Sequence, residues 1–172
     1  MDDFVSRSPF ASFEPLNSRA VKWNNRYLDM ASLVGSWSMD PSSKIGAVAV
    51  GEDGQILSTG YNGFPRRLKD YSFRLEDREL KYKYVVHAEM NIVYNASLNG
   101  VSLKGSTVYV DGLPICSECA KGLIQAGVDR IVVRLNDIEK SDKWKESWRL
   151  SHSMFLEAGV TVEIMGEPVG QA

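Results

Sequence analysis

Residues 107–133 read TVYVDGLPICSECAKGLIQAGVDRIVV, and this stretch decides the fold. An apolar, β-branched run over 107–110 is followed by a segment of helical spacing over 116–126, which Gly127 closes. A second apolar run follows at 130–133. A strand, a helix and a strand in this order predict two parallel strands joined by a right-handed crossover.

The same alternation continues on both sides of this unit. A helix and a strand follow it, and a helix, a hairpin and another helix precede it. The highly charged connection over 66–84 has helical character only around 75–80. The predicted ranges are 21–38 for the first helix, 45–50 and 55–60 for the hairpin, 88–96 for the next helix, and 144–158 and 160–165 for the last helix and strand.

These elements predict an α/β fold, a three-layer α/β/α sandwich with a mixed, mostly parallel five-stranded sheet. Residues 1–19 show no sustained period and are predicted to form an irregular N-terminal arm. Residues 20–172 are predicted to form a single domain. A chain of 172 residues with 44% hydrophobic content is long enough for one well-buried core and short for two.

The charge balance argues against a polyanionic partner. The chain has 20 Lys and Arg against 22 Asp and Glu, so it offers no general attraction to nucleic acid. It opens without a basic segment and an apolar core, and no apolar run approaches the roughly 20 residues that span a bilayer. Two cysteines in one C-x-x-C pair do not make a disulfide framework. We therefore expect a soluble, cytoplasmic protein without membrane contact.

Two short segments hold the candidate metal ligands. The segment from His87 to Glu89 contains one of the two histidines, and the segment from Pro114 to Cys119 contains both cysteines. One His and two Cys match the three protein ligands of a catalytic zinc ion, whose fourth position stays open for water. The C-x-x-C pair alone would also suit a redox centre or a structural site. A structural Cys₂His₂ site would need His152, which we expect to be a surface or packing histidine.

The spacing of these residues favours catalysis. If Cys116 opens a helix, Cys119 lies one turn later on the same face, and the positive helix end favours the thiolates that zinc binds. If His87 caps a second helix, Glu89 can reach past it to a zinc-bound water, whose pKa zinc lowers to around 7. H-x-E followed by P-C-x-x-C resembles the signature of zinc-dependent nucleobase deaminases. This resemblance implies that Glu89 carries protons to a ring nitrogen and to departing ammonia.

The chain from about Trp23 to Met165 resembles the deoxycytidylate deaminases, the branch of the cytidine deaminase superfamily that converts dCMP to dUMP. The zinc motifs alone identify only the superfamily, whereas the G-Y-N-G-x-P segment is similar to the deoxycytidylate branch. The matching segments are DPSSKIGA at 40–47, GYNGFP at 60–65, YVVHAEMN at 84–91, CSECAK at 116–121 and QAG at 125–127.

The resemblance implies roles for single residues in binding the substrate dCMP. Asn62 is expected to bind the deoxyribose hydroxyl, although it could equally be a turn residue. The backbone N–H of Ala88 is expected to meet the pyrimidine ring. Lys44 and Lys143 are candidates for the substrate phosphate, although surface lysines are usually just solvated.

The resemblance also implies regulation and assembly. It leads us to expect a homo-oligomer, a hexamer, with one zinc ion per subunit, activated by dCTP with Mg²⁺ and inhibited by dTTP. Mg²⁺ is expected only together with a triphosphate effector. A triphosphate needs positive charge, which the residues after the G-Y-N-G-x-P loop supply; a solvated basic loop is an equal alternative. The residues implied in effector binding are Gly60, Tyr61, Asn62, Gly63, Arg66 and Arg67.

Two other functions stay open at this point. The chain could deaminate another nucleoside, nucleotide or base, such as a modified cytosine nucleotide, guanine or tRNA adenosine, although its acidic balance argues against tRNA. It could also be a non-catalytic nucleotide-binding protein in which zinc joins two helix ends. Such a structural site would give no reason for Glu89.

Overall fold

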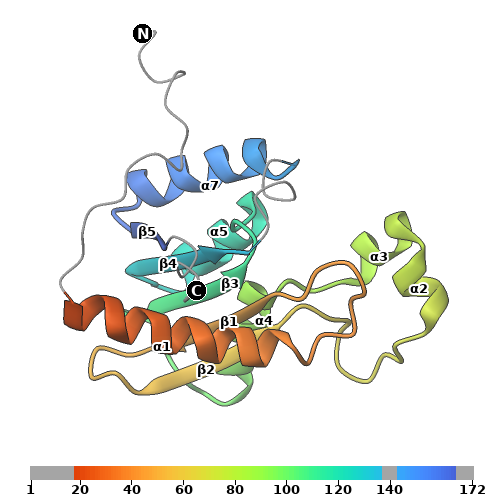
Figure 1. Ribbon diagram of the computed structural model, residues 1–172, viewed down its shortest axis with the longest axis horizontal. Helices are drawn as coiled ribbons and strands as arrows, with labels where there is room; N and C mark the ends of the chain where they lie inside the picture. The colour runs from red at the N-terminus through yellow and green to blue at the C-terminus, as the bar shows by residue number, and fades with distance from the viewer. Residues whose placement is uncertain (1–17, 137–142, 166–172) are drawn as a thin grey trace, which may run out of the picture.

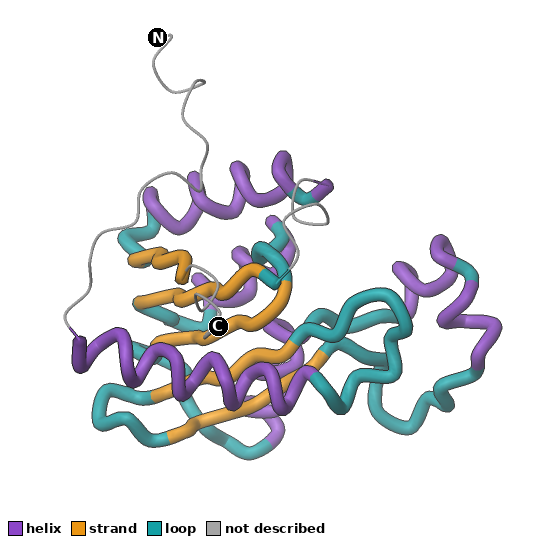
Figure 2. Tube along the Cα trace, in the orientation of Figure 1, coloured by secondary structure: helices purple, strands orange, loops and turns teal. Residues whose placement is uncertain are grey.

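The computed structural model describes residues 18–136 and 143–165, which form a central sheet flanked by helices (Figures 1 and 2). The strands lie in the order β2-β1-β3-β4-β5. They are β1 (Gly46–Val50), β2 (Ile56–Tyr61), β3 (Thr107–Gly112), β4 (Arg130–Leu135) and β5 (Thr161–Met165). The helices are α1 (Ser18–Gly35), α2 (Ser72–Glu76), α3 (Arg78–Tyr84), α4 (Ala88–Leu98), α5 (Ser117–Gln125) and α7 (Lys145–Glu157).

The sheet is mixed. β1 runs antiparallel to both of its neighbours, β2 and β3, whereas β4 runs parallel to β3 and to β5. Four of the five strands therefore point in the same direction. The parallel steps are joined through α5 and α7. The predicted mixed five-stranded sheet is confirmed.

Helices cover both faces of the sheet. Successive residues of a strand point to opposite faces, so neighbours in β1 belong to different buried clusters. Val48 of β1 packs into one buried cluster with Leu28 and Ala31 of α1. Its neighbours Ala47 and Ala49 belong to a second cluster, which contains buried residues of α4, α5 and α7. Figure 1 shows α1 on one side of the strands and α7 on the other. The predicted three-layer sandwich is confirmed.

Helix α4, which begins next to the His87 to Glu89 segment, packs closely on β2. A Cβ added to Gly60 would lie 2.6 Å from the carbonyl oxygen of Ala88, so the two backbones meet without an intervening side chain. The amide of Asn91 donates a hydrogen bond to the carbonyl of Tyr61 at 2.7 Å. These contacts fix the start of α4 against the sheet.

The charged connection over 66–84 contains two short helices, α2 and α3, rather than one helical stretch around 75–80. Asp77 separates them, because its backbone is extended and its carboxylate accepts a hydrogen bond from the Leu80 N–H at 2.9 Å. That geometry is an N-cap and starts a new helix. The pair projects from the body of the molecule in Figure 1.

The first helix ends at Gly35, three residues earlier than the predicted Ser38. The chain turns there, and the Ser38 hydroxyl donates a hydrogen bond to the carbonyl of Asn62 at 2.7 Å. Most of the predicted N-terminal arm, residues 1–17, lies outside the described residues. Among the helices that the structure describes, none is long and apolar enough to cross a membrane.

Candidate active site and metal centre

Two helices begin side by side, and each begins at a candidate metal ligand. His87 is the N-cap of α4, with φ −69° and ψ 155°, and Cys116 is the N-cap of α5, with φ −75° and ψ 162°. Cys119 follows in the first turn of α5. The Nδ1 atom of His87 lies 3.4 Å from the Sγ atom of each cysteine. The structure thus brings the three predicted ligands together, with all ligand atoms within 4.8 Å of one another.

The spacing of these atoms suits a tetrahedral zinc ion. Zinc–sulfur bonds of about 2.3 Å and zinc–nitrogen bonds of about 2.0 Å, at a tetrahedral angle, place sulfur and nitrogen about 3.5 Å apart. The observed separations of 3.4 Å agree with this value. Within residues 18–136 and 143–165 no other set of three His, Cys, Asp or Glu side chains clusters in this way. His152 instead packs beside Trp148, with ring centroids 6.0 Å apart.

The three ligands strongly perturb one another's protonation. The hydrogen bond with Cys119, aided by His87 and opposed by burial, lowers the pKa of the Cys116 thiol to about 4. The contact with Cys116 raises the pKa of His87 to about 9, and a matching contact raises the pKa of Cys119. Without a metal ion, these pKa values favour a Cys116 thiolate beside a positively charged His87. A divalent cation among these atoms would take the place of the protons and favour two thiolates and a neutral imidazole.

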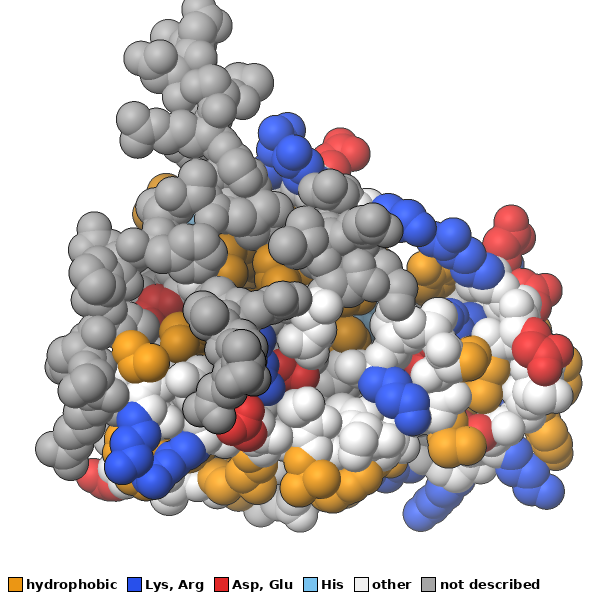
Figure 3. Space-filling model, viewed as in Figure 1, with side chains coloured by type: hydrophobic (Ala, Val, Ile, Leu, Met, Phe, Trp, Pro, Cys, Tyr) orange, Lys and Arg blue, Asp and Glu red, His pale blue; other side chains and the backbone are white. Residues whose placement is uncertain are grey.

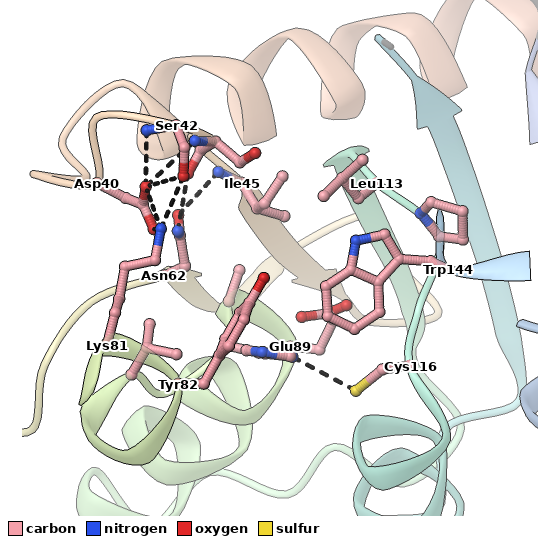
Figure 4. A pocket seen from close by; sticks show the side chains of 15 residues that line it. Asp40, Ser42, Ile45, Asn62, Lys81, Tyr82, Glu89, Leu113, Cys116 and Trp144 are labelled. Atoms are coloured by element: carbon pink, nitrogen blue, oxygen red, sulfur yellow. Dashed lines mark hydrogen bonds and ion pairs between the residues drawn. The ribbon is translucent and has the colours of Figure 1, made fainter. Parts of the chain in front are cut away.

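Glu89 lies in the first turn of α4 and is only 4% exposed. Burial raises the pKa of its carboxyl group, against the lowering effect of His87. Glu89, His87 and Cys116 line one cavity (Figure 4). A buried carboxyl group with a raised pKa, close to candidate metal ligands, is typical of a general acid or base.

The cavity has an apolar inner wall, formed by Ile45, Val85, Leu113 and Trp144. Trp144, the N-cap of α7, presents its ring edge-on to His87, with centroids 6.2 Å apart and an interplanar angle of 84°. Figure 4 shows Trp144 near Glu89 and Cys116 at one end of the cavity. A flat heteroaromatic ring would fit this environment.

The other end of the cavity is polar. The Nζ atom of Lys81 lies 3.1 Å from Asp40 and 2.7 Å from the Ser42 hydroxyl (Figure 4). No sequence pattern indicates a role for Lys81, because its partner Asp40 is 41 residues away. None indicates a role for Trp144 or Tyr82 either. The D-P-S-S segment, noted for its resemblance, and the predicted substrate residue Asn62 marked this end of the cavity.

The candidate substrate residues of the cavity wall are Asn62 and Ala88. Asn62 is 6% exposed, and its side chain holds the backbone of the preceding loop. Its Oδ1 atom accepts a hydrogen bond from the Ile45 N–H at 2.8 Å, and its Nδ2 atom donates one to the Ser43 carbonyl at 2.9 Å.

The two candidate phosphate lysines are placed differently. Lys44 is exposed, does not line the catalytic cavity, and has its Nζ atom 3.4 Å from the Ser36 carbonyl. Lys143 is exposed and lines a cleft that adjoins the catalytic cavity. Arg78 and Lys81 line the same cleft.

The candidate effector residues gather around a second cavity of about 410 Å³, with one exception. Asn62 faces the catalytic cavity instead. Gly63, on the wall of the second cavity, exchanges two backbone hydrogen bonds with Val86, which directly precedes His87. The predicted effector residues that line this second cavity are Gly60, Tyr61, Gly63, Arg66 and Arg67.

Comparisons with known proteins agree with this site. A family described as "Cytidine and deoxycytidylate deaminase zinc-binding region" matches residues 21–135, more than half of the chain. The chain is 38% identical over 141 residues to an uncharacterized deaminase in the luxG 3′ region of Aliivibrio fischeri, covering 82% of the chain and 92% of that protein. It is 35% identical over 148 residues to the deoxycytidylate deaminase of Homo sapiens, covering 82% and 78%.

The fold has a similar counterpart among solved structures. The dCMP deaminase from the cyanophage S-TIM5, solved in complex with dCMP and dUMP, superposes with a TM-score of 0.65 at 25% identity. The superposition covers 90% of this chain and 100% of the other.

Proposed function

The chain belongs to the family of zinc-dependent cytidine and deoxycytidylate deaminases, and on this premise we propose that it converts dCMP and water to dUMP and ammonia. The observation that carries the proposal is the presence, in one cavity, of a three-ligand zinc site and the buried Glu89. The human relative named deoxycytidylate deaminase and the cyanophage enzyme bound to dCMP and dUMP support the choice of substrate.

Glu89 is proposed to move every proton of the reaction. Zinc, when bound to His87, Cys116 and Cys119, supplies a water molecule that is acidic enough to react at neutral pH. Glu89 would accept a proton from the attacking water and donate it to the ring nitrogen beside the amine-bearing carbon, while the water oxygen would bond to that carbon. Glu89 then transfers the remaining hydroxyl proton to the amine, the carbon–nitrogen bond breaks, and ammonia leaves. The buried position of Glu89 suits a group that gains and loses protons within one cycle.

Asn62 and Ala88 are proposed to orient the nucleoside. The Asn62 amide uses one lone pair and one N–H on Ile45 and Ser43, which leaves one N–H and one lone pair for a sugar hydroxyl. The backbone N–H of Ala88 would meet the base. Trp144 would pack beside the ring and exclude water from the reacting carbon.

The substrate phosphate is proposed to bind in the cleft that adjoins the cavity. Lys143 lines this cleft, which supports its assignment, and Arg78 and Lys81 line it too. Lys44, the other lysine proposed from the resemblance, does not line this cleft, and its Nζ atom lies 3.4 Å from the Ser36 carbonyl. We therefore favour Arg78 and Lys143 over Lys44, because a doubly charged phosphate is held best by more than one cation.

A nucleoside triphosphate with Mg²⁺ is proposed to bind in the second cavity, with dCTP as activator and dTTP as inhibitor. Arg66 and Arg67 supply positive charge, and Trp37 and Tyr61 supply aromatic surface, with ring centroids 6.2 Å apart. The hydrogen bonds between Gly63 and Val86 offer a short path from this cavity to His87. The hexameric assembly and the cytoplasmic location expected from the sequence stay part of the proposal.

The experiment that tests the proposed function is a substrate panel. Purified zinc-loaded protein is incubated with dCMP, CMP, deoxycytidine, guanine and a tRNA anticodon stem-loop, each with and without dCTP or dTTP, and ammonia release is measured. The highest kcat/KM is expected for dCMP. A preference for guanine or tRNA would overturn the substrate assignment. On the face shown in Figure 3, basic and acidic side chains are interspersed, which does not favour RNA.

A further inference from the structure

One face of helix α7 is directed at the segment that carries the cysteine ligands. Trp148 and Phe155 on this face are 1% and 0% exposed, as expected for an amphipathic helix on a core. Two serines, Ser147 and Ser151, lie among these aromatic residues at a spacing of one turn. Ser151 is 0% exposed, and burial of a hydroxyl group is unfavourable unless it forms hydrogen bonds. The hydroxyl groups therefore call for an explanation.

Ser151 holds the backbone just before Cys116. Its hydroxyl lies 2.7 Å from the carbonyl oxygen of Ile115, a residue that is itself 0% exposed. The same hydroxyl lies 2.8 Å from the Ser147 carbonyl within the helix. Since a hydroxyl carries one proton, the two carbonyls share a single donor. The contact outside the helix gives a buried carbonyl its hydrogen bond.

Ser147 holds the backbone just after Cys116. The Ser117 N–H donates a hydrogen bond to the Ser147 hydroxyl at 2.9 Å. Ser117 is the first residue of α5, and the N–H groups of a first helical turn have no partner within the helix. One turn of α7 therefore fixes the peptide groups on both sides of Cys116.

We propose that Ser147 and Ser151 are positioning residues of the zinc centre, which hold the Cys116 sulfur in place for the metal. The proposal rests on the zinc site of the proposed function but not on the identity of the substrate. The Cys116 sulfur must stay 3.4 Å from the His87 Nδ1 atom while the side chain keeps its N-cap conformation. Groups that orient metal ligands from outside the coordination shell typically change metal affinity by about 10- to 100-fold when removed.

The test compares Ser147→Ala, Ser151→Ala and the double variant with the wild-type enzyme. Zinc release into an excess of a chromogenic chelator is followed, and the Co²⁺-substituted proteins are compared by their thiolate-to-metal absorption. We expect zinc release to be faster by about 10-fold in each single variant and up to about 100-fold in the double variant. The cobalt spectrum should change as well. Ser147→Thr, which keeps the hydroxyl, should restore both properties.

Ser153→Ala provides the matched control, because Ser153 lies on the exposed side of the same helix. It should leave zinc release and the cobalt spectrum unchanged. Wild-type zinc release and cobalt spectrum in Ser147→Ala and Ser151→Ala would overturn the proposal, even if thermal stability fell. If the double variant does not fold, zinc release and the cobalt spectrum of Ser147→Ala and Ser147→Thr test the proposal, because Ser147 is only half-buried. Failure of the substrate assignment would not alter these metal measurements.

Discussion

The Nζ atom of Lys81 lies 3.1 Å from a carboxylate oxygen of Asp40, and the two side chains are only 9% and 8% exposed. Lys81 belongs to α3, and Asp40 belongs to the loop before β1. The pair therefore ties the projecting helices to the sheet domain at the polar end of the catalytic cavity. Because the ion pair is buried, removal of either charge alone should destabilise the fold.

Lys81→Met is expected to lower the free energy of unfolding by about 3–5 kcal/mol, because it leaves the carboxylate of Asp40 buried without its cation. Urea unfolding measures the change. Adding Asp40→Asn should recover part of the loss by removing the second charge. Lys121→Met removes the exposed ion pair with Glu118, whose side chains are 55% and 79% exposed, and should cost less than about 1 kcal/mol. Equal losses in both variants would contradict this interpretation.

Acid should weaken the contribution of the Asp40 carboxylate to the free energy of unfolding. Burial by itself would raise the pKa of this carboxyl group, but hydrogen bonds from Ser42, Lys81 and Ser43 outweigh it and hold the pKa below its ordinary value of 3.8. A lowered folded-state pKa stabilises the fold above the unfolded-state value and loses this effect as pH falls further. The stability difference between the wild type and Asp40→Asn should be constant near neutral pH and shrink below about pH 4. A stability difference that grows on acidification would contradict a lowered pKa of Asp40 in the folded protein.

Glu89→Gln should abolish most turnover while zinc stays bound. A glutamine cannot shuttle protons, so kcat should fall by at least about 10²- to 10⁴-fold. Metal analysis should still give one zinc ion per chain, since Glu89 is not a ligand. Glu118→Gln on the exposed side of α5 is the control and should keep full activity. Appreciable turnover by Glu89→Gln would remove this residue from the mechanism.

Gly60→Ala is expected to destabilise the protein and to lower kcat together. The added Cβ would lie 2.6 Å from the Ala88 carbonyl and 2.7 Å from the Ile92 amide nitrogen, so the start of α4 must shift with His87 and Glu89. Overpacking of this kind costs about 1–3 kcal/mol. At Gly63 the nearest atoms to a new Cβ are those of the Tyr61 ring at 3.6 Å, an ordinary contact. Gly63→Ala should therefore keep its stability in thermal unfolding, whereas a similar loss in both variants would contradict the packing argument.

The sequence predicted those parts of the molecule that depend on local patterns. The helix starts at His87 and Cys116, and the clustering of these ligands with Cys119, follow from short motifs at strand and helix ends. The layers and the parallel pairing of β3 with β4 follow from the alternation of apolar segments. These are the features that the structure and the family comparison support.

The rest depends on how distant segments dock. The roles inferred for Ser147 and Ser151 depend on where α7 crosses α5, which no spacing within α7 determines. The pairing of Lys81 with Asp40 requires the projecting α2 and α3 to return to the loop before β1. Lys44 shows the limit of a matching segment: its place there suggested phosphate binding, whereas its exposed side chain lies by the Ser36 carbonyl, so its role stays a prediction.

Recognition of the substrate phosphate can be separated from recognition of the base by comparing dCMP with deoxycytidine. Arg78→Gln and Lys143→Gln should each raise KM for dCMP by about tenfold or more, because a hydrogen bond to a charged group contributes about 1.5–3 kcal/mol. The kcat/KM for deoxycytidine, which has no phosphate, should stay unchanged. Lys44→Gln is the control and should affect neither substrate. If Lys44→Gln alone raised KM for dCMP, the phosphate would bind on the Lys44 side, and the cleft of Arg78, Lys81 and Lys143 would have no part in substrate recognition.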